Sequence, residues 1–322
     1  MKKIFAIVLT VAATVAAAGA QTYPSRSITM IVPFAPGGLT DVIGRLLAEG
    51  MRKSLGQSII IENVGGADGS IGTGRAARAP PDGYTLIVGV WNTHVGNGVT
   101  RDLKYDVVRD FEPIALLADA PLVLVTRRDM AANNLKELLT WLKANPEKAS
   151  MGTTGAGGPN EVVSVLLQKE TGARFVFVPY RGAGPLVQGL AGGQVDVSFL
   201  NPATALPQVR AGSIKAFAVT AKSRLAIAPD IPSVDEAGLP GLYFSLWAGL
   251  FAPRGTSKEI IAKLNAAAVS GLGDPTIREK VIAQGLELPR PGQMTPEALG
   301  ALQKAEIEKW WPVIKAAGIK AE

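Results

Sequence analysis

A glycine-rich segment that could bind an anion occurs twice in the chain. The two copies read Pro36-Gly37-Gly38-Leu39-Thr40-Asp41-Val42-Ile43 and Ala156-Gly157-Gly158-Pro159-Asn160-Glu161-Val162-Val163. Paired glycines let the backbone approach a ligand and present its N–H groups to it. Each pair is followed by residues that begin a helix, and a helix N-terminus carries a partial positive charge. The repeat therefore predicts two cradles for a carboxylate or a similar anion.

Polar residues at the start of these two helices have predictable roles. Thr40 and Asn160 stand where we expect the N-caps, and Asp41 and Glu161 fall in the first turn. A carboxylate that faced the site would repel an anion, so we expect both acids to favour the helix dipole and to accept hydrogen bonds from loop amides. A single copy would also suit an ordinary strand-to-helix turn, whereas two matched copies favour binding.

The glycines could instead belong to a nucleotide site. The segment Gly155-Ala156-Gly157-Gly158-Pro159-Asn160 has Asn where the third glycine of G-x-G-x-x-G belongs, and the sequence holds no G-x-x-x-x-G-K-[ST]. Nucleotide binding is therefore disfavoured. A third glycine-rich stretch, Gly66–Gly74, is interpreted as a turn leading into a helix.

The elements that must position these loops follow an alternating pattern of strand and helix. The expected strands are Ile28–Val32, Ser58–Glu62, Thr85–Val90, Leu122–Thr126, Ala149–Gly152, Phe175–Tyr180, Val195–Leu200, Ala216–Thr220 and Trp247–Ala252. The expected helices are Asp41–Leu55, Ile71–Ala79, Leu135–Ala144, Glu161–Thr171, Ala183–Gly192, Lys258–Gly271, Asp274–Gln284 and Pro296–Ala317. Such alternation predicts an α/β fold with mostly parallel sheets flanked by helices, and ligand sites beyond the carboxyl ends of the strands.

Two extended segments divide this pattern into two lobes. Pro121–Thr126 and Ser245–Ala252 are interpreted as paired crossings into and out of a second lobe, with a hinge between the lobes. We therefore expect lobe 1 to comprise residues 21–123 plus 248–322, and lobe 2 to comprise residues 124–247. Each lobe then carries one glycine-rich loop.

The first residues have the features of a signal peptide. Lys2 and Lys3 precede the apolar run Ile4–Ala18, and Ala18-Gly19-Ala20 offers small residues for cleavage after Ala20. The run is shorter than the ~20 residues that span a bilayer as a helix. The chain has no cysteine, so it cannot form disulfides or carry a cysteine-linked lipid anchor. We expect an exported protein of the periplasm, residues 1–20 being removed.

Composition and motifs disfavour several function classes. The formal net charge is +6, and its Lys and Arg residues are dispersed among acids, which argues against nucleic-acid binding. The sequence has one histidine, no metal-ligand cluster and no G-x-S-x-G nucleophile motif. An α/β enzyme acting on organic acids remains an alternative because fold does not settle function. We expect no catalytic residue, no metal and no cofactor.

Further polar residues follow the predicted strands and could contact the distal end of a ligand. They are Asn92, Thr93 and His94, then Tyr180 and Arg181, and then Asn201. Alternatives are open for several: His94 as an ordinary loop residue, and Arg181 as one member of an ion pair that orders a loop or joins the lobes. Trp247 could pack at the hinge or form the floor of the pocket, and Trp310-Trp311 is interpreted as core.

Motifs spread over the whole mature chain carry a family resemblance. They are Tyr23-Pro24-Ser25-Arg26, Val32-Pro33-Phe34-Ala35-Pro36-Gly37-Gly38 with Asp41, Pro81-Asp82-Gly83-Tyr84-Thr85-Leu86, Val178-Pro179-Tyr180-Arg181-Gly182, Gly192-Gly193-Gln194-Val195-Asp196 and Pro232-Ser233-Val234-Asp235-Glu236-Ala237-Gly238. The chain resembles the extracytoplasmic solute receptors of tripartite tricarboxylate transporters, also called Bug receptors. It departs from the family's common form at Val64-Gly65-Gly66, where Arg-Pro-Gly is frequent, and at Leu200-Asn201-Pro202, where Asp-Asn often occurs.

The resemblance implies a periplasmic-binding-protein (Venus flytrap) fold in which loops Phe34–Asp41 and Gly152–Asn160 hold a ligand carboxylate, partly through ordered water. It implies a monomer that delivers a small di- or tricarboxylate, or a related organic acid, to the large and small membrane subunits of the transporter. A sensor that docks on a membrane kinase is an alternative, and amino acids and aromatic acids remain open as ligands. The expected ligand-binding residues are Phe34, Pro36, Gly37, Gly38, Thr40, Asp41, Asn92, Thr153, Thr154, Gly155, Gly157, Gly158, Asn160, Tyr180, Arg181 and Asn201.

Overall fold

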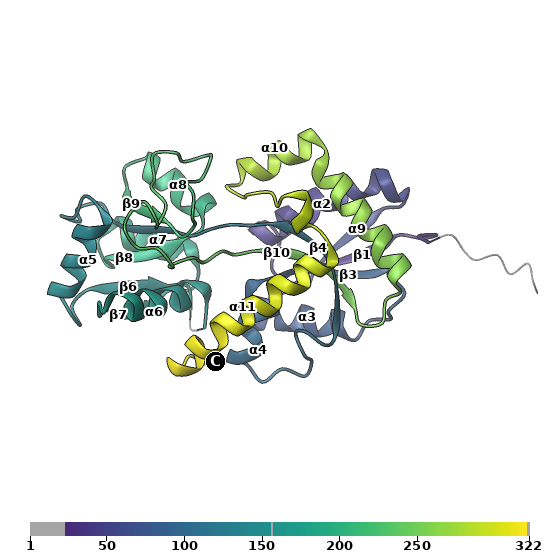
Figure 1. Ribbon diagram of the computed structural model, residues 1–322, viewed down its shortest axis with the longest axis horizontal. Coiled ribbons are helices and arrows are strands. Elements are labelled where there is room, and N and C mark those ends of the chain that lie inside the picture. The colour runs from purple at the N-terminus through teal and green to yellow at the C-terminus, as the bar shows by residue number, and fades with distance from the viewer. Residues whose placement is uncertain (1–22, 156, 321–322) are drawn as a thin grey trace, which may run out of the picture.

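The computed structural model describes residues 23–155 and 157–320, and it consists of two α/β bodies joined by extended segments (Figure 1). The expected signal peptide and its cleavage after Ala20 lie outside the described residues. Among the described residues, the strands form two five-stranded sheets, one in each body. We call the body that contains the N-terminal sheet lobe 1 and the other lobe 2. The expected two-lobed α/β fold is confirmed.

The sheet of lobe 1 has the strand order β2-β1-β3-β10-β4. Its strands are β1 (Ile28–Val32), β2 (Ile59–Asn63), β3 (Thr85–Val90), β4 (Phe111–Ala118) and β10 (Ala248–Pro253). Strands β1, β2 and β3 are parallel, whereas β10 is antiparallel to both of its neighbours, β3 and β4. The sheet is therefore mostly parallel, as expected.

Helices cover both faces of this sheet. The helices are α2 (Leu39–Leu55), α3 (Ser70–Ala77), α4 (Asn97–Thr100), α9 (Lys258–Gly273), α10 (Pro275–Ala283) and α11 (Pro296–Ala316), with short helical turns η1 (Ala67–Gly69), η2 (Asn92–Gly96) and η3 (Pro291–Gln293). On β1, Met30 packs into the core shared with α2, α9 and α10, and Ile31 packs into the core that contains residues of α3 and α11. Burial on both faces explains the nearly continuous apolar sequence of β1.

Lobe 2 repeats this arrangement with the strand order β7-β6-β8-β5-β9. Its strands are β5 (Val123–Arg127), β6 (Ser150–Thr153), β7 (Val176–Pro179), β8 (Val197–Leu200) and β9 (Ile214–Val219), and its helices are α5 (Leu135–Ala144), α6 (Pro159–Thr171), α7 (Ala183–Ala191) and α8 (Pro202–Arg210). Strand β5 is antiparallel to β8 and β9, whereas β6 is parallel to β7 and β8. The carboxyl ends of β6, β7 and β8 therefore meet at one edge of the sheet.

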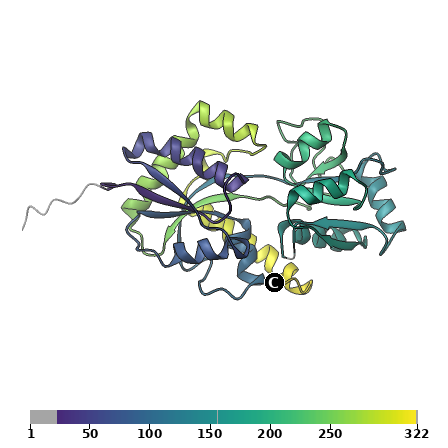
Figure 2. The ribbon, with the colours of Figure 1, turned by 180° about the vertical axis from the view of Figure 1, so that it is seen from behind.

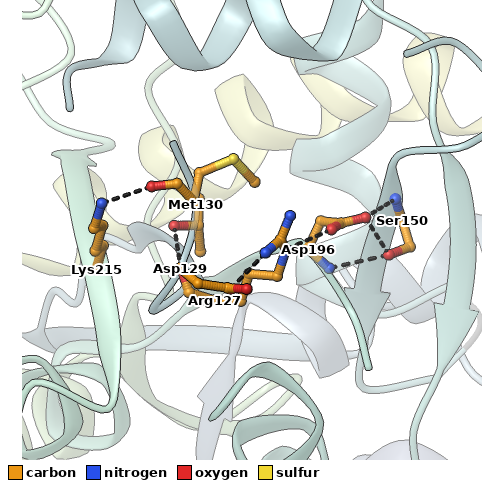
Figure 3. A network of polar contacts seen from close by, with 7 residues as sticks. Arg127, Asp129, Met130, Ser150, Asp196 and Lys215 are labelled. Carbon is orange, nitrogen blue, oxygen red and sulfur yellow. Dashed lines mark hydrogen bonds and ion pairs between the residues drawn. The ribbon is translucent and has the colours of Figure 1, made fainter. Parts of the chain in front are cut away.

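A polar network fixes the opposite edge of the lobe 2 sheet (Figure 3). Asp196 accepts hydrogen bonds from the backbone N–H and the hydroxyl of Ser150, at 2.8 and 2.7 Å, and from Arg127 Nε at 2.8 Å. Arg127 also pairs with Asp129, and Lys215 donates to the carbonyl of Met130 at 2.6 Å. Asp196 belongs to one of the motifs that carry the family resemblance, and its role here is to join three neighbouring strands.

The segments that join the lobes pair with each other at the hinge, as expected. Pro121 and Ser245 form an antiparallel bridge, and Leu246 N donates to Ala120 O at 2.9 Å. The Ser245 hydroxyl donates to the Asp119 carboxylate. Viewed from either side, two connecting segments run between the lobes (Figures 1 and 2). The predicted division at residues 123 and 124 falls inside β5, and the lobe bounds stay a prediction.

The sequence pattern missed β4 and α8 and placed a loop where η2 and α4 lie. Strand β4 contains Pro113, which is unfavourable in a central strand but is tolerated here because β4 lies at the edge of its sheet. Helix α8 contains Pro207 and spans only Pro202–Arg210, so its apolar periodicity is short. Strands β1 and β3 and helix α5 have the predicted bounds, and the other predicted elements differ from the observed ones by a few residues.

A partly buried carboxyl of α11 lies beside the hinge. Glu306 accepts hydrogen bonds from the indole N–H groups of Trp91 and Trp310, both at 3.0 Å, and lines a groove that also contains Asp119 and Lys309. Burial raises the pKa of Glu306, while Lys309 and the two indoles oppose this shift and Asp119 adds to it. The protonated form is therefore favoured by the folded state more than by the unfolded chain.

We predict that Glu306→Gln makes stability less dependent on pH. The unfolded chain loses this proton at a pKa of about 4.3, whereas the folded chain keeps it to a higher pH. The folded state thus binds more protons in that window, so the wild type loses stability as pH rises through it. In urea unfolding between pH 4 and 8, the free energy of unfolding of Glu306→Gln should increase relative to that of the wild type as pH rises. The matched change Glu308→Gln, on the exposed face of α11, should show no such gain.

Candidate functional site

The first glycine loop lies between β1 and α2 and is fixed by Asp41. Gly37 has a φ of +85°, and Gly38 is the N-cap of α2 with φ −77° and ψ 168°. The Asp41 carboxylate accepts hydrogen bonds from Gly37 N, Arg45 Nε and Asn63 Nδ2, each at 2.9 Å. Asn63 Nδ2 also donates to Phe34 O at 3.1 Å. One carboxylate therefore joins the loop to α2 and to the end of β2.

The environment of Asp41 shows that this acid is bound to the loop. Only 3% of its surface is exposed. The hydrogen bond from Arg45, helped by those from Gly37 and Asn63, lowers the pKa of Asp41 to about 2 against the opposing effect of burial. The expectation that Asp41 bonds a loop amide is confirmed. Its predicted direct contact with ligand stays untested, and three donors already occupy most of its acceptor sites.

The second glycine loop, between β6 and α6, has the same geometry. Gly157 has a φ of +76°, and Gly158 is the N-cap of α6 with φ −75° and ψ 161°. The Glu161 carboxylate accepts a hydrogen bond from Gly157 N at 2.7 Å, as Asp41 does from Gly37 N. The repeat in the sequence is therefore a repeat in backbone conformation and in hydrogen bonding.

The predicted N-caps were wrong by two residues. Gly38 and Gly158 are the caps, so Thr40 and Asn160 are the second residues of their helices. Asn160 is buried, donates to Phe199 O and accepts from Thr154 Oγ1 at 2.9 Å. Its side chain therefore holds the loop onto the end of β8. The acid in each first turn accepts a hydrogen bond from the glycine that precedes the N-cap, and no side chain caps the N-terminus of α2 or α6.

A cavity of about 330 Å³ lies between the lobes at the second glycine loop. Its lining residues are Asp68, Asn92 and Arg101 from lobe 1 and Thr154, Gly155, Gly158 and Pro159 from lobe 2. The structure thus brings Asn92 together with part of the predicted Gly152–Asn160 loop. Residues Phe34–Asp41 are not among those that line this cavity, although the Phe34 ring lies against Gly69, next to Asp68.

Asp68 and Arg101 line this cavity but were not predicted from the sequence. Asp68 is the one charged residue between Glu62 and Arg75, and this isolated charge in a glycine-rich turn was the available signal. Arg101 follows η2 and α4, which the sequence pattern treated as loop, so nothing placed it at the cavity. Asn92 Nδ2 lies 3.2 Å from one Asp68 carboxylate oxygen and 3.4 Å from the other.

Comparisons with known proteins agree with the two-lobed fold. The family described as "Tripartite tricarboxylate transporter family receptor" matches residues 43–319. Protein BugT of Bordetella pertussis is 34% identical over 319 residues, which cover 98% of this chain and 97% of BugT. The chain belongs to the tripartite tricarboxylate transporter receptor family. The resemblance inferred from the sequence motifs is confirmed.

Two solved structures of similar receptors contain acids. MatC (Rpa3494) from Rhodopseudomonas palustris, with bound malate, is 38% identical with a TM-score of 0.78, and the match covers 91% of this chain and 100% of MatC. Rpa4515 from R. palustris, with adipate, is 32% identical with a TM-score of 0.81, and the match covers 92% of this chain and 99% of Rpa4515. At these identities and coverages, the likeness extends over both lobes.

In this family member, the histidine lies in the core rather than in the cleft. His94 is fully buried and stacks on Phe251 with ring centroids 4.2 Å apart. Its Nδ1 lies 2.9 Å from the hydroxyl of Thr93, which is also buried. Burial lowers the pKa of His94 to about 3. The expectation that Thr93 and His94 face the cleft was wrong, because η2 turns both side chains inward against β3 and β10.

The remaining predicted contacts of the receptor do not line the cavity. The Tyr180 ring packs against α7 at Gly189, where an added Cβ would meet the hydroxyl, and Arg181 is exposed. The Asn201 side chain caps α8 by accepting from Thr204 N at 2.9 Å. All three follow strand ends at the same sheet edge as Thr154, and their contact with ligand stays a prediction.

The tryptophans divide between hinge and core. Trp247 is 2% exposed and lines the groove at the hinge. Of the two alternatives left by the sequence, it therefore packs at the hinge. Trp310 is fully buried, as expected, whereas Trp311 is half-buried and donates to Val95 O at 3.0 Å. Among the described residues, no helix is long and apolar enough to cross a membrane, and no group of side chains is suited to hold a metal ion.

The backbone angles predict that Gly37, rather than Gly38, resists substitution in this receptor. An added Cβ at Gly37 meets no atom within 4 Å, and at Gly38 the nearest atom is Ala35 O at 3.8 Å. Space is therefore available at both, but the φ of +85° at Gly37 is unfavourable for alanine. We expect Gly37→Ala to cost about 1–2 kcal/mol in urea unfolding and Gly38→Ala less. Equal losses would show that φ does not decide the difference.

Proposed function

We propose that this chain is a periplasmic solute-binding receptor that captures a small carboxylate between its lobes and delivers it to a tripartite tricarboxylate transporter. The observation that carries the proposal is the cavity in which the second glycine loop, on lobe 2, faces Asn92 and Arg101 of lobe 1. A ligand there contacts both lobes at once, so its binding favours their closure. The large and small membrane subunits of the transporter are the proposed partners of the closed monomer.

The chemistry of the cavity supports an anionic ligand. The N-terminus of α6 carries the partial positive charge of a helix, and Arg101 adds a full positive charge across the cavity. The glycine backbone at 155 and 158 leaves space for a carboxylate to approach the loop. The malate and adipate held by the two similar receptors support a dicarboxylate or a related organic acid as the ligand.

Binding without catalysis is the proposal that these residues support best. His94, the one histidine of the sequence, is buried in the core with its pKa held at about 3, so it is not placed to exchange protons with a ligand. The two first-turn acids, Asp41 and Glu161, are engaged by loop amides. The matched family and the solved relatives are receptors or binding proteins, which supports the same conclusion.

A thermal-shift screen of organic acids tests the proposal directly. A ligand at 100 times its dissociation constant stabilises the folded state by about 2.7 kcal/mol. We expect at least one small carboxylate to reach this level, and its neutral amide analogue to have no effect. Small-angle scattering with the best acid should show a more compact particle. If no carboxylate stabilises the protein, the proposed function is wrong.

A substitution in the second loop tests where the carboxylate binds. We expect Gly158→Val to weaken every acid by at least tenfold, about 1.4 kcal/mol. The φ of −75° accepts valine, but an added Cβ would lie 3.2 Å from Gly155 O and 3.6 Å from Thr154 Oγ1, and the side chain would fill the approach to the loop. Gly184→Val in α7, where an added Cβ meets no atom within 4 Å, is the control. A folded Gly158→Val protein with native affinity would place the site elsewhere.

The proposed location requires that the signal peptide be removed. Because Lys2 and Lys3, the apolar run and Ala18-Gly19-Ala20 have the order of a secretory signal, we expect a soluble mature protein that begins at Gln21. Mass spectrometry of the exported protein measures this start. A membrane-associated product that retains residues 1–20 would contradict the prediction.

A further inference from the structure

An acidic side chain lies in the cavity proposed for an acidic ligand. Asp68 comes from the loop between β2 and α3 and lines the cavity together with Asn92 and Arg101. An ionised carboxylate there repels the carboxylate of a ligand unless the ligand also brings a hydrogen-bond donor to it. Asp41 and Glu161 avoid this conflict because they bond loop amides. Asp68 therefore needs a different explanation.

The loop holds Asp68 in place with an unfavourable backbone. Asp68 has φ 49° and ψ 42°, and Ala67 before it has φ 46°, so two successive residues with side chains are left-handed. Asn97, which is 2% exposed, donates from Nδ2 to the carbonyl of Asp68 at 2.9 Å. A buried side chain thus fixes the conformation that presents Asp68 at the cavity.

The Asp68 carboxylate keeps acceptor capacity for a ligand. Its two oxygens can accept about four hydrogen bonds, and Asn92 Nδ2 is the donor seen close to them, at 3.2 and 3.4 Å. The residue is exposed, yet the surrounding atoms displace enough water to raise the pKa of Asp68, against the opposing effects of Asn92 and Arg101. An acceptor that is partly desolvated interacts more strongly with a donor that reaches it.

The cavity therefore carries two kinds of charge. Arg101 and the N-terminus of α6 suit a carboxylate, whereas Asp68 suits a donor. A hydroxyl or ammonium group on the carbon chain of an organic acid provides such a donor beside its carboxylate. An acid that has neither group gives Asp68 no hydrogen bond in place of the water that it loses. The affinity for such an acid is therefore lower.

We propose that Asp68 determines specificity by accepting a hydrogen bond from a hydroxyl or ammonium substituent, so that the receptor prefers substituted over unsubstituted carboxylic acids. This inference rests on the proposed function, since it concerns the same cavity. It names the ligand class within that function: hydroxy acids or amino acids.

Matched sets of acids test the inference by titration calorimetry. Each set has one carbon skeleton with hydrogen, hydroxyl or ammonium at the same position: propionate, lactate and alanine; succinate, malate and aspartate; glutarate, 2-hydroxyglutarate and glutamate; and benzoate with its 2-hydroxy and 2-amino forms. We expect the wild type to bind a substituted member at least about tenfold more tightly than its unsubstituted parent.

Two substitutions that tolerate a left-handed backbone separate the role of the side chain from that of the loop. Asp68→Gly removes the carboxylate, and we expect it to abolish the preference within a set and to strengthen binding of the unsubstituted acid. Asp68→Asn keeps an oxygen acceptor without the charge. It should retain a preference for hydroxyl if the ligand is a hydroxy acid, and lose the preference for ammonium if the ligand is an amino acid. Asp102→Asn, which removes a 92% exposed charge next to Arg101, is the control and should change no ranking.

The outcomes distinguish this inference from the proposed function. If wild type and Asp68→Gly rank the members of each set alike, or if the wild type prefers the unsubstituted parents, the role of Asp68 is refuted while carboxylate binding stands. If the wild type binds no carboxylate in any set or in the wider screen, both proposals fail. Asp102→Asn reproducing the effect of Asp68→Gly would also refute the inference, because a general change in charge would then explain it.

Discussion

A hydrogen bond from a loop glycine to a carboxylate one helical turn later sets the geometry of both glycine loops. Gly37 N donates to Asp41, and Gly157 N donates to Glu161. The bond holds the first glycine left-handed and leaves the second extended, as the N-cap. With this bond in place, the first turn of each helix keeps N–H groups that point out of the helix, where an anion can reach them. In α6 this excludes Pro159, which has no N–H, and Glu161, whose N–H donates to Gly158 O at 3.1 Å. The first-turn amides can face a ligand because the two acids accept their hydrogen bonds from Gly37 N and Gly157 N instead.

The acidic side chains near the site differ in how many hydrogen-bond donors surround them. Asp41 is surrounded by an amide, a guanidinium and a carboxamide that together satisfy it, and these contacts lower its pKa to about 2. Asp68 has a carboxamide beside it and an open side toward the cavity. Burial without sufficient donors raises a carboxyl pKa, and burial with them lowers it. The pKa values of the two acids are therefore shifted in opposite directions, although each acid follows a strand of the same sheet.

The connection between the lobes accounts for the antiparallel strand in each sheet. Strand β10 enters lobe 1 and strand β5 enters lobe 2, each from the hinge, and each runs antiparallel to its neighbours. The two segments pair at the hinge through Pro121 and Ser245. Aromatic rings pack nearby, and the ring centroid of Phe244 lies 5.0 Å from those of both Trp91 and Trp310. Motion of one lobe against the other must therefore be absorbed in a few residues beside this packed cluster.

The sequence by itself determined the alternation of strands and helices, the paired crossings, and the two glycine loops with their first-turn acids. These features depend on local periodicity and on residues a few positions apart, which a linear reading contains. Only the tertiary structure decided which polar residues share a cavity: it turned His94 into the core, used Asn160 and Asn201 to hold loops and helix ends, and brought Asp68 and Arg101 to Thr154. Those placements result from how β3, η2 and α6 pack across two lobes. No spacing along the chain encodes that packing.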